Sequence, residues 1–419
     1  MTNPKTSDLA LAGVRILDLT RILAGPWATQ ILADLGAEVI KIEHPDGGDD
    51  TRSWGPPYVI DDAGADRGAA YFHSANRGKK SVVVDIRKPE GQRVLCALAK
   101  TSDVVIENFK VGGLAKYGLD YTNVSQVKPD IVYCSITGFG HTGPYADRAG
   151  YDFLIQAMGG LMSVTGQKEG TAGAEPMKVG VALTDILTGL YAVIGILAAL
   201  RHRDATGEGQ QIDMALLDVQ VATLANQAMN YLATGTSPRP LGNTHPSIVP
   251  YQAFETSDGY VILAIGNDGQ FARFCEVAGV QGLASDDRFA SNPERVRNRA
   301  TLIPILQGVM SGRSMNEWIE ALNAAHVPVG PINDLERVFD DPQIQARGMR
   351  TAPIAADGAR LQGVASPLKL SKTPPIPPMA APDLGADTLA VLRQLLDPSE
   401  FDINALEAAG AVQFWKGQS

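Results

Sequence analysis

One carboxylate, Asp185, stands near the start of a long apolar stretch that runs from Val181 to Arg201. The stretch has a helical composition, and it ends in cations that suit the C-terminal end of a helix dipole. Two interpretations of the carboxylate follow. Thr184 or Asp185 can cap the first helical turn, or Asp185 can be a partly desolvated nucleophile, kept ionised by the helix N-terminus and aimed at an electrophile. Spacing alone leaves both open.

The composition of the rest of that stretch predicts the surroundings of the carboxylate. A helix this apolar is expected to be buried on nearly every side. Glycines interrupt it and charged residues flank it closely, so we do not expect it to cross a membrane.

The composition limits the classes of function. The 419 residues suggest two domains, or one large domain with an insertion. Apolar residues make up 45% and charged residues 20%, which is enough for a large core. The net charge of −10 argues against nucleic acid as a partner, although local basic clusters can still bind a phosphorylated ligand.

The cysteines and histidines indicate a reducing compartment and no metal. Cys96, Cys134 and Cys275 are widely spaced and odd in number, as expected of free thiols rather than of a disulfide framework. The six histidines are scattered and no C-x-x-C occurs, so we expect no metal site. The N-terminus has no apolar signal core, so we expect a cytoplasmic protein.

Strands alternate with helices through the first third of the chain, which predicts an α/β fold with a parallel, doubly wound sheet. We expect strands at 14–19, 38–43, 81–85, 103–107 and 131–136, helices at 26–35 and 89–100, and a helical stretch from 210 to about 234. The first strand-to-helix turn, Thr20–Pro26, lacks the G-x-G-x-x-G of dinucleotide-binding proteins. A nicotinamide or flavin enzyme is therefore not expected.

Basic residues gather at the ends of these expected strands, at 76–80 and at Arg87 and Lys88. They form either a solvated rim or a phosphate-binding edge, because α/β folds place ligands at the carboxyl ends of their strands.

Short motifs in a fixed order make the chain resemble the class III CoA-transferases, the family of formyl-CoA transferase and carnitine CoA-transferase, which also includes α-methylacyl-CoA racemase. The matching motifs are Ala24-Gly-Pro26, Leu35-Gly-Ala-Glu-Val-Ile-Lys-Ile-Glu43, Glu107-Asn-Phe109, Gly150-Tyr-Asp152, Thr184-Asp185, Thr206-Gly-Glu-Gly-Gln210 and Asn243-x-His-Pro246. Each is weak alone, but together they run in order through about three-quarters of the chain.

The resemblance implies a large Rossmann-like domain that is discontinuous in sequence, a smaller α+β domain, and an interlocked homodimer. Applied to this chain, it predicts the first part of the large CoA-binding domain at 1–212, a linker helix at 213–240, the small domain at 241–335 and a C-terminal return at 336–419 that completes the large domain.

The resemblance also assigns site residues. The family's catalytic aspartate falls on Asp185. Its CoA-contacting positions fall on Leu23, Ala24, His44, Val84, Asp85, Ile86, Arg87, Asn108, Phe109, Lys110 and Lys116, and we add Tyr151 and Asp152 as candidates for the same binding site. Leu23 stands where formyl-CoA transferase has glutamine, which weakens the case for formate or oxalate, and His44 stands where it has arginine.

The implied activity is transfer of CoA from an acyl-CoA donor, with succinyl-CoA as a candidate, to a free carboxylic acid through a covalent intermediate on Asp185. The expected partners are acyl-CoA, a carboxylic acid and a second copy of the chain, with CoA as substrate and no tightly bound cofactor. A catalytically silent acyl-CoA-binding protein is disfavoured because Asp185 is present.

The alternative activity is that of an α-methylacyl-CoA racemase. A racemase needs proton-exchanging groups on both faces of the α-carbon, and histidine suits this better than tyrosine. Racemases of the family have histidine before the aspartate of the Gly-x-Asp motif, where this chain has Tyr151, so the transferase is favoured.

Two further residues keep open interpretations. Asp152 either orients the site or is a structural turn residue. His245 is either a loop hydrogen-bonding residue or a substrate contact. We expect the loop that contains His245, together with Leu23 and Tyr251, to determine which acceptor acid binds.

Overall fold

The structure is a computed structural model that describes residues 9–415. The N-terminal residues 1–8, on which the signal-sequence expectation depends, lie outside the described residues. The chain divides into two compact units. The first contains the residues up to Leu161, Val179–Ala228 and the chain from Pro342 onward, and the second contains Met162–Lys178 and Met229–Asp341.

Among the described residues, the first unit is built on a seven-stranded sheet in the order β14-β5-β2-β1-β6-β7-β8. The strands are β1 (Arg15–Asp18), β2 (Glu38–Glu43), β5 (Lys80–Val84), β6 (Val104–Glu107), β7 (Val132–Thr137), β8 (Gln210–Ala215) and β14 (Val412–Gln413). Neighbouring strands are parallel except at the edge, where β14 runs antiparallel to β5. The predicted α/β fold with a parallel sheet is confirmed.

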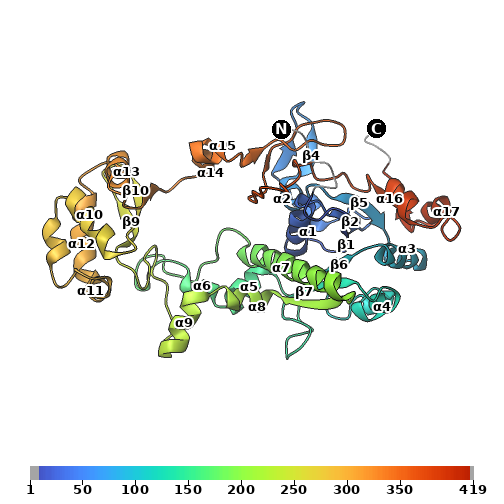
Figure 1. Cartoon of the computed structure of the whole chain (residues 1–419), viewed down its shortest axis with the longest axis horizontal. Helices are drawn as coiled ribbons and strands as arrows, with labels where there is room; N and C mark the ends of the chain where they lie inside the picture. The colour runs from blue at the N-terminus through green and yellow to red at the C-terminus, as the bar shows by residue number, and fades with distance from the viewer. Residues whose placement is uncertain (1–8, 416–419) are drawn as a thin grey trace. The chain divides into compact units, whose positions relative to one another are not determined.

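The inner strands are short apolar runs because both of their faces are covered. Every residue of β6 and β7 is buried. On one face lie α1 (Ala24–Asp34) and α7 (Leu183–Thr206), and on the other lie α3 (Pro89–Lys100), α4 (Tyr121–Val127), α16 (Thr388–Leu395) and α17 (Ile403–Ala408) (Figure 1). Each face has its own apolar core.

The helical stretch expected from 210 is wrong at its start, and with it the start of the linker helix at 213–240. Residues 210–215 form the edge strand β8, which pairs with β7 from Val132↔Gln210 to Thr137↔Ala215. Several of these residues favour helix, which explains the wrong prediction. Their burial nevertheless alternates as in a strand, because Ile212 and Met214 are partly buried while Asp213 is exposed. Two helices follow, α8 (Leu216–Ala222) and α9 (Ala225–Thr234).

The expectation that the Asp185 helix is buried on nearly every side is also wrong for a single chain. In α7, Leu190, Tyr191 and Ile194 are 40%, 41% and 60% exposed. Of the described helices, α7 is the one long and apolar enough to cross a membrane by length and composition, a test that the core helix of a soluble protein also passes. Here its other face packs on α1, β7 and β8.

The C-terminal segment closes one edge of the sheet. Asp387 Oδ2 accepts from Ser81 N–H at 2.9 Å, Thr388 Oγ1 accepts from Val83 N–H at 3.0 Å, and β14 pairs with the same strand. These contacts occupy the outer hydrogen-bonding groups of β5, which would otherwise be an open edge.

The second unit has a small antiparallel sheet in the order β11-β10-β9 and its own core around Phe254, Phe274 and Trp318. Its elements include β9 (Tyr251–Glu255), β10 (Tyr260–Ala264), β11 (Val329–Pro331), α10 (Asp268–Val277), α11 (Asn292–Arg297), α12 (Arg299–Met310), α13 (Met315–Ala324) and α14 (Leu335–Asp340). The remaining elements are β3 (Tyr58–Ile60), β4 (Asp66–Ala69), α2 (Ala70–Ala75), α5 (Asp152–Met158), α6 (Leu161–Val164), α15 (Pro342–Ala346), β12 (Arg350–Thr351), β13 (Gly363–Val364) and short 3-10 turns at 50–53, 115–117 and 281–285.

Close packing of α7 on α1 depends on Gly189. A Cβ there would lie 2.8 Å from the Ala24 carbonyl oxygen and 3.2 Å from Trp27 Cβ. We therefore expect Gly189→Ala to destabilise the first unit by about 1–3 kcal/mol, although alanine favours helix. Hydrogen exchange in α7 measures the loss of protection.

The matched control is Gly308→Ala in α12, where a Cβ would have no neighbour within 4 Å. This change should stabilise its helix by up to about 1 kcal/mol. Unchanged protection of α7 in Gly189→Ala would show that the two helices tolerate a wider separation.

Candidate active site

Asp185 lies in the first turn of α7 and lines a cavity of about 420 Å³ in the first unit. The cavity wall brings together nine of the predicted site residues, which are Leu23, Ala24, Asn108, Phe109, Lys110, Lys116, Tyr151, Asp152 and Asp185. They come from segments that follow β1, β6 and β7 and from the start of α7, so the carboxyl ends of neighbouring parallel strands supply most of the wall.

The N-terminus of α7 is capped by Asp152. Its Oδ1 accepts the backbone N–H of Thr184 at 2.9 Å and that of Asp185 at 3.2 Å. Neither Thr184 nor Asp185 caps the helix with its own side chain, so the first of the two interpretations that spacing left open does not apply. The cap comes from the start of another helix, α5, 33 residues away in sequence.

Buried amides hold this cap in place. Gln156, one turn further along α5, donates from Nε2 to Asp152 Oδ2 at 2.7 Å and accepts the N–H of Val179 at 3.0 Å. Thr184 Oγ1 donates to Gln220 Oε1 at 2.6 Å. Gln156, Gln220 and Thr184 are each 0% or 1% exposed, so the network fixes the start of α7 without contact with solvent.

The cap has an electrostatic consequence for the nucleophile candidate. Burial, followed by the negative charge of Asp152, raises the pKa of Asp185 to about 7. The helix N-terminus therefore does not offset the rise in the pKa of Asp185. The physical reason is that Asp152, not Asp185, accepts the first N–H groups of the helix.

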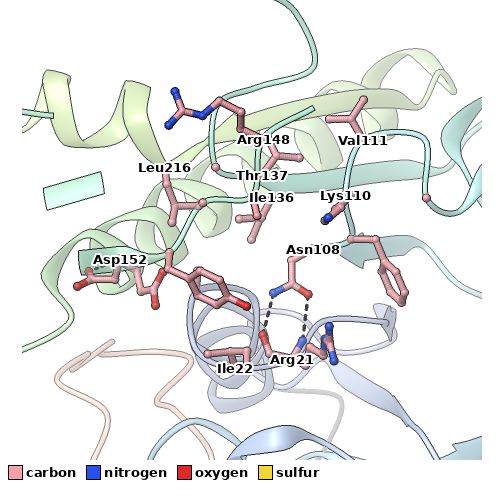
Figure 2. A pocket seen from close by; sticks show the side chains of 18 of the residues that line it. Arg21, Ile22, Asn108, Lys110, Val111, Ile136, Thr137, Arg148, Asp152 and Leu216 are labelled. Carbon is pink, nitrogen blue, oxygen red and sulfur yellow. Dashed lines mark hydrogen bonds between the residues drawn. The ribbon is translucent and has the colours of Figure 1, made fainter. Parts of the chain in front are cut away.

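The turn after β1 is held in an uncommon conformation. Ile22 has a φ of 73°, which is rare for a β-branched residue. The side-chain amide of Asn108 makes two hydrogen bonds with the backbone of Arg21 (Figure 2). The Arg21 N–H donates to Asn108 Oδ1 at 3.1 Å, and Asn108 Nδ2 donates to the Arg21 backbone oxygen at 2.7 Å. Asp49 accepts the N–H of Ile22 at 3.3 Å. The amide of Asn108 thus positions the turn that carries Leu23 and Ala24.

Two buried ion pairs lie beneath this turn. Lys41 binds Asp49 at 2.8 Å and also donates to the Thr20 oxygen at 2.9 Å. Lys79 lies 3.3 Å from Asp18, and its burial lowers its pKa to about 7 despite that partner. All four charged side chains are at most 1% exposed, so the turn rests on a fixed polar base.

A second cavity of about 210 Å³ adjoins the first, because Arg21 and Phe109 line both. It contains three more predicted residues, His44, Val84 and Ile86. The Nδ1 of His44 accepts the N–H of Asp46 at 3.0 Å, so in the neutral ring the proton is on Nε2.

Two predicted residues, Asp85 and Arg87, line neither of these cavities. Arg87 donates from Nε and Nη2 to the two oxygens of Asp85, at 2.8 Å and 2.9 Å. Arg87 also lies 3.6 Å from Asp46. Within the described chain, the Arg87 guanidinium therefore forms ion pairs with the carboxylates of Asp85 and Asp46.

Several residues at the site were not predicted from the sequence. Arg148 and Thr137 line the first cavity, and the pKa of Tyr71 is raised by its burial and then by the charges of Asp185, Asp152 and Asp49. For Gln156 a signal existed, since it stands four residues after Asp152, the spacing at which two side chains meet on one face of a helix. His245 and Tyr251 contact each other within the second unit, with ring centroids 5.4 Å apart.

The family model described as "CoA-transferase family III" matches residues 11–388. The chain belongs to this family. It is 51% identical to the succinate–glutarate CoA-transferase of Agrobacterium fabrum, over 94% of this chain and 98% of the relative. It is 42% identical to the human succinyl-CoA:glutarate CoA-transferase, over 96% of this chain and 90% of the relative.

A crystal structure of a CAIB/BAIF family protein from Brucella suis matches with a TM-score of 0.81 and 50% identity, over 93% of this chain and all of that chain. The resemblance drawn from short motifs is therefore confirmed, and with it the class of enzyme: a CoA-transferase acting on acyl-CoA.

The carboxylate pair predicts a pH dependence. A carboxylate attacks only when ionised, and a group with a pKa of about 7 is about one-tenth ionised at pH 6. We expect kcat/KM for acyl-CoA to fall about tenfold per pH unit below about 7. In Asp152→Asn this acid limb should move to lower pH, because the neighbouring negative charge is gone while Oδ1 can still cap α7.

The measurement is kcat/KM against pH, which reports the free enzyme. Asp152→Ala is the matched comparison: it should show the same shift with a larger loss of rate, because the cap is lost as well. An acid limb at the same pH in all three proteins would contradict the coupling between the two carboxylates.

Proposed function

We propose that the enzyme transfers CoA from succinyl-CoA to a free dicarboxylate such as glutarate, with Asp185 as the covalent nucleophile. The observation that carries this proposal is the position of Asp185, whose partly desolvated carboxylate shares one cavity with the loops that match the family's CoA-contacting positions. Relatives at 51% and 42% identity are named for succinate, or succinyl-CoA, and glutarate.

The reaction proceeds in four acyl transfers. The Asp185 carboxylate attacks the succinyl thioester carbon. This step forms a mixed anhydride and releases CoA thiolate. The thiolate attacks the aspartyl carbonyl and releases succinate. The acceptor carboxylate then attacks the aspartyl–CoA thioester, and thiolate leaves again. Finally, the thiolate attacks the acceptor carbonyl, which yields the new acyl-CoA and free Asp185. Each step breaks one acyl bond and forms another, so no tightly bound cofactor is required.

The chain supports these steps in three ways. Burial removes solvent from the Asp185 carboxylate, and burial together with the charge of Asp152 raises its pKa, which makes the carboxylate a stronger nucleophile when ionised. The Asp152 cap fixes the direction of the first turn of α7. Gly113, Gly138 and Gly150 line the cavity, so their backbone amides can approach the developing oxyanion without hindrance from a side chain.

CoA itself would lie along the two adjoining cavities. Lys110 and Lys116 on the first cavity and His44 on the second are cationic or donor groups suited to its phosphates. Leu23, Ala24, Phe109, Val84 and Ile86 offer apolar contacts for the pantetheine chain. Asn108 acts through the turn that it holds. Asp85 and Arg87 form a neutral pair beside the second cavity.

We further propose a Rossmann-like large domain, completed by the C-terminal return, in a homodimer whose chains interlock. The parallel strands follow the order of Rossmann-like sheets, which supports the first part. The exposed apolar side chains of α7, together with Phe153 on α5 and Leu232 on α9, support the second. The free thiols Cys96, Cys134 and Cys275 suit a cytoplasmic location.

Replacing Asp185 with alanine should abolish transfer while CoA still binds. Removal of a covalent nucleophile costs several orders of magnitude in kcat. The assay mixes succinyl-CoA with glutarate and detects glutaryl-CoA by mass spectrometry. Hydroxylamine added to the wild type with succinyl-CoA should give a modified Asp185, and near-normal turnover of the alanine variant would disprove the covalent role.

The racemase alternative predicts a different product. With Tyr151 in place of histidine, we expect no exchange of the α-proton of a 2-methylacyl-CoA in deuterated water. Rapid deuterium incorporation, with no CoA transferred to any acid, would replace the transferase with the racemase.

The dimer is tested at the exposed face of α7. Ile194→Glu places a charge on an apolar surface, so sedimentation should show a monomer or aggregate in place of the wild-type dimer. Gln126→Glu, at an exposed position of α4 in the first unit, is the control for added negative charge. A monomeric wild type would contradict the proposal.

A further inference from the structure

Arg148 lies at the end of a glycine-rich loop that leaves β7 and returns to α5. The two ends of the loop touch: a Cβ built on Gly138 would lie 2.6 Å from Gly150 Cα, and one on Gly150 would lie 2.4 Å from Gly138 Cα. Only glycines permit this approach, so the loop is closed tightly two residues after Arg148. The loop therefore holds Arg148 on the wall of the cavity that also contains Asp185.

The Arg148 guanidinium rests on two aromatic rings. It lies 4.5 Å from the centroid of Tyr145 and 5.0 Å from that of Phe139, and the two rings pack edge to face at 5.6 Å. Stacking occupies the face of a guanidinium and leaves its in-plane N–H donors free. The one side-chain hydrogen bond that the structure shows for it is a long one, 3.8 Å from Nη2 to the sulfur of Met158.

Among residues 9–415, no carboxylate forms an ion pair with Arg148, whereas the other arginine on the cavity wall, Arg21, binds Asp50 at 3.0 Å. Figure 2 draws Arg148 at the upper edge of the cavity, with Arg21 and Ile22 at the lower edge. The cavity wall thus includes an exposed guanidinium that forms no ion pair with another side chain of the described chain.

The charge of the cavity indicates what that ligand must be. Asp152 and Asp185 already bring negative charge, and a dicarboxylate acyl group brings another carboxylate that takes no part in the reaction. Unpaired burial of that carboxylate would be costly, and a planar fork with two parallel N–H donors is its best partner.

We propose that Arg148 binds the non-reacting carboxylate of the acyl group and thereby selects dicarboxylates over monocarboxylates. This inference rests on the proposed transferase function and adds its specificity determinant. Because donor and acceptor occupy the same place in successive halves of the reaction, one arginine serves succinyl-CoA and glutarate alike. The aromatic rings hold the fork ready, so little side-chain freedom is lost on binding.

The test compares pairs of substrates that differ only in the distal carboxylate: succinyl-CoA with butyryl-CoA, and glutarate with pentanoate. In Arg148→Gln we expect kcat/KM for both dicarboxylate substrates to fall about 10- to 100-fold, with that for both monocarboxylates nearly unchanged, since a hydrogen-bonded charge is lost. Arg148→Lys should be intermediate, because it keeps the charge without the fork. Arg288→Ala, an exposed arginine paired with Asp286 in the second unit, is the control.

A binding measurement without turnover separates this inference from the function on which it rests. Equilibrium dialysis of labelled glutarate against CoA-loaded enzyme should show at least tenfold weaker binding to Arg148→Gln, with CoA affinity unchanged. Failure of the wild type to form glutaryl-CoA would overturn the proposed function but leave this measurement valid for Arg148.

Two results would overturn the role of Arg148. Equal glutarate binding by the wild type and Arg148→Gln would show that the distal carboxylate is held elsewhere. Equal losses for succinyl-CoA and butyryl-CoA, with weaker CoA binding, would show that the arginine contacts a phosphate of CoA instead.

Discussion

The site depends on one hydrogen-bonded contact, in which the carboxylate of Asp152 accepts the first backbone N–H groups of α7. This contact joins two elements that are distant in sequence and sets the direction in which Asp185 leaves its helix. It also withholds from Asp185 the stabilisation that a helix N-terminus normally gives an anion. In the proposed mechanism, a carboxylate with a pKa of about 7 is more basic than an ordinary carboxylate and is still partly ionised near neutral pH. Covalent catalysis by a carboxylate needs both properties.

The sequence was sufficient for five strands of the sheet and for part of the wall of the first cavity. Apolar stretches such as Val82-Val83-Val84 predicted their strands because strands covered on both faces need apolar residues. It was insufficient at 210–215, where residues that favour helix form an edge strand because β7 offers a free edge. Such a partner is a tertiary contact, which local propensity does not encode.

The roles of individual site residues were harder to predict than their membership of the site. Asn108 was predicted through the family's CoA-contacting positions, and the structure adds that its amide binds the backbone N–H and oxygen of Arg21. The sequence did not decide whether Asp152 orients the site or is a structural turn residue, because its hydrogen-bond partners, Thr184 and Asp185, are in another helix. Arg148 carried no motif, and what distinguishes it is the lack of a carboxylate partner within the described chain, a property that exists only once the chain is folded.

The closure of β5 by β14 places a constraint on biosynthesis. The strand that must be covered ends at Val84, while the residues that pair with it, Val412 and Gln413, are made much later. The edge of β5 therefore stays unpaired until these residues have been made and have left the ribosome. The second unit, by contrast, has all of its strands and its own core in one stretch between Tyr251 and Pro331. It is therefore able to fold before the residues that close β5 are made, whereas the first unit reaches its final form only after they have emerged.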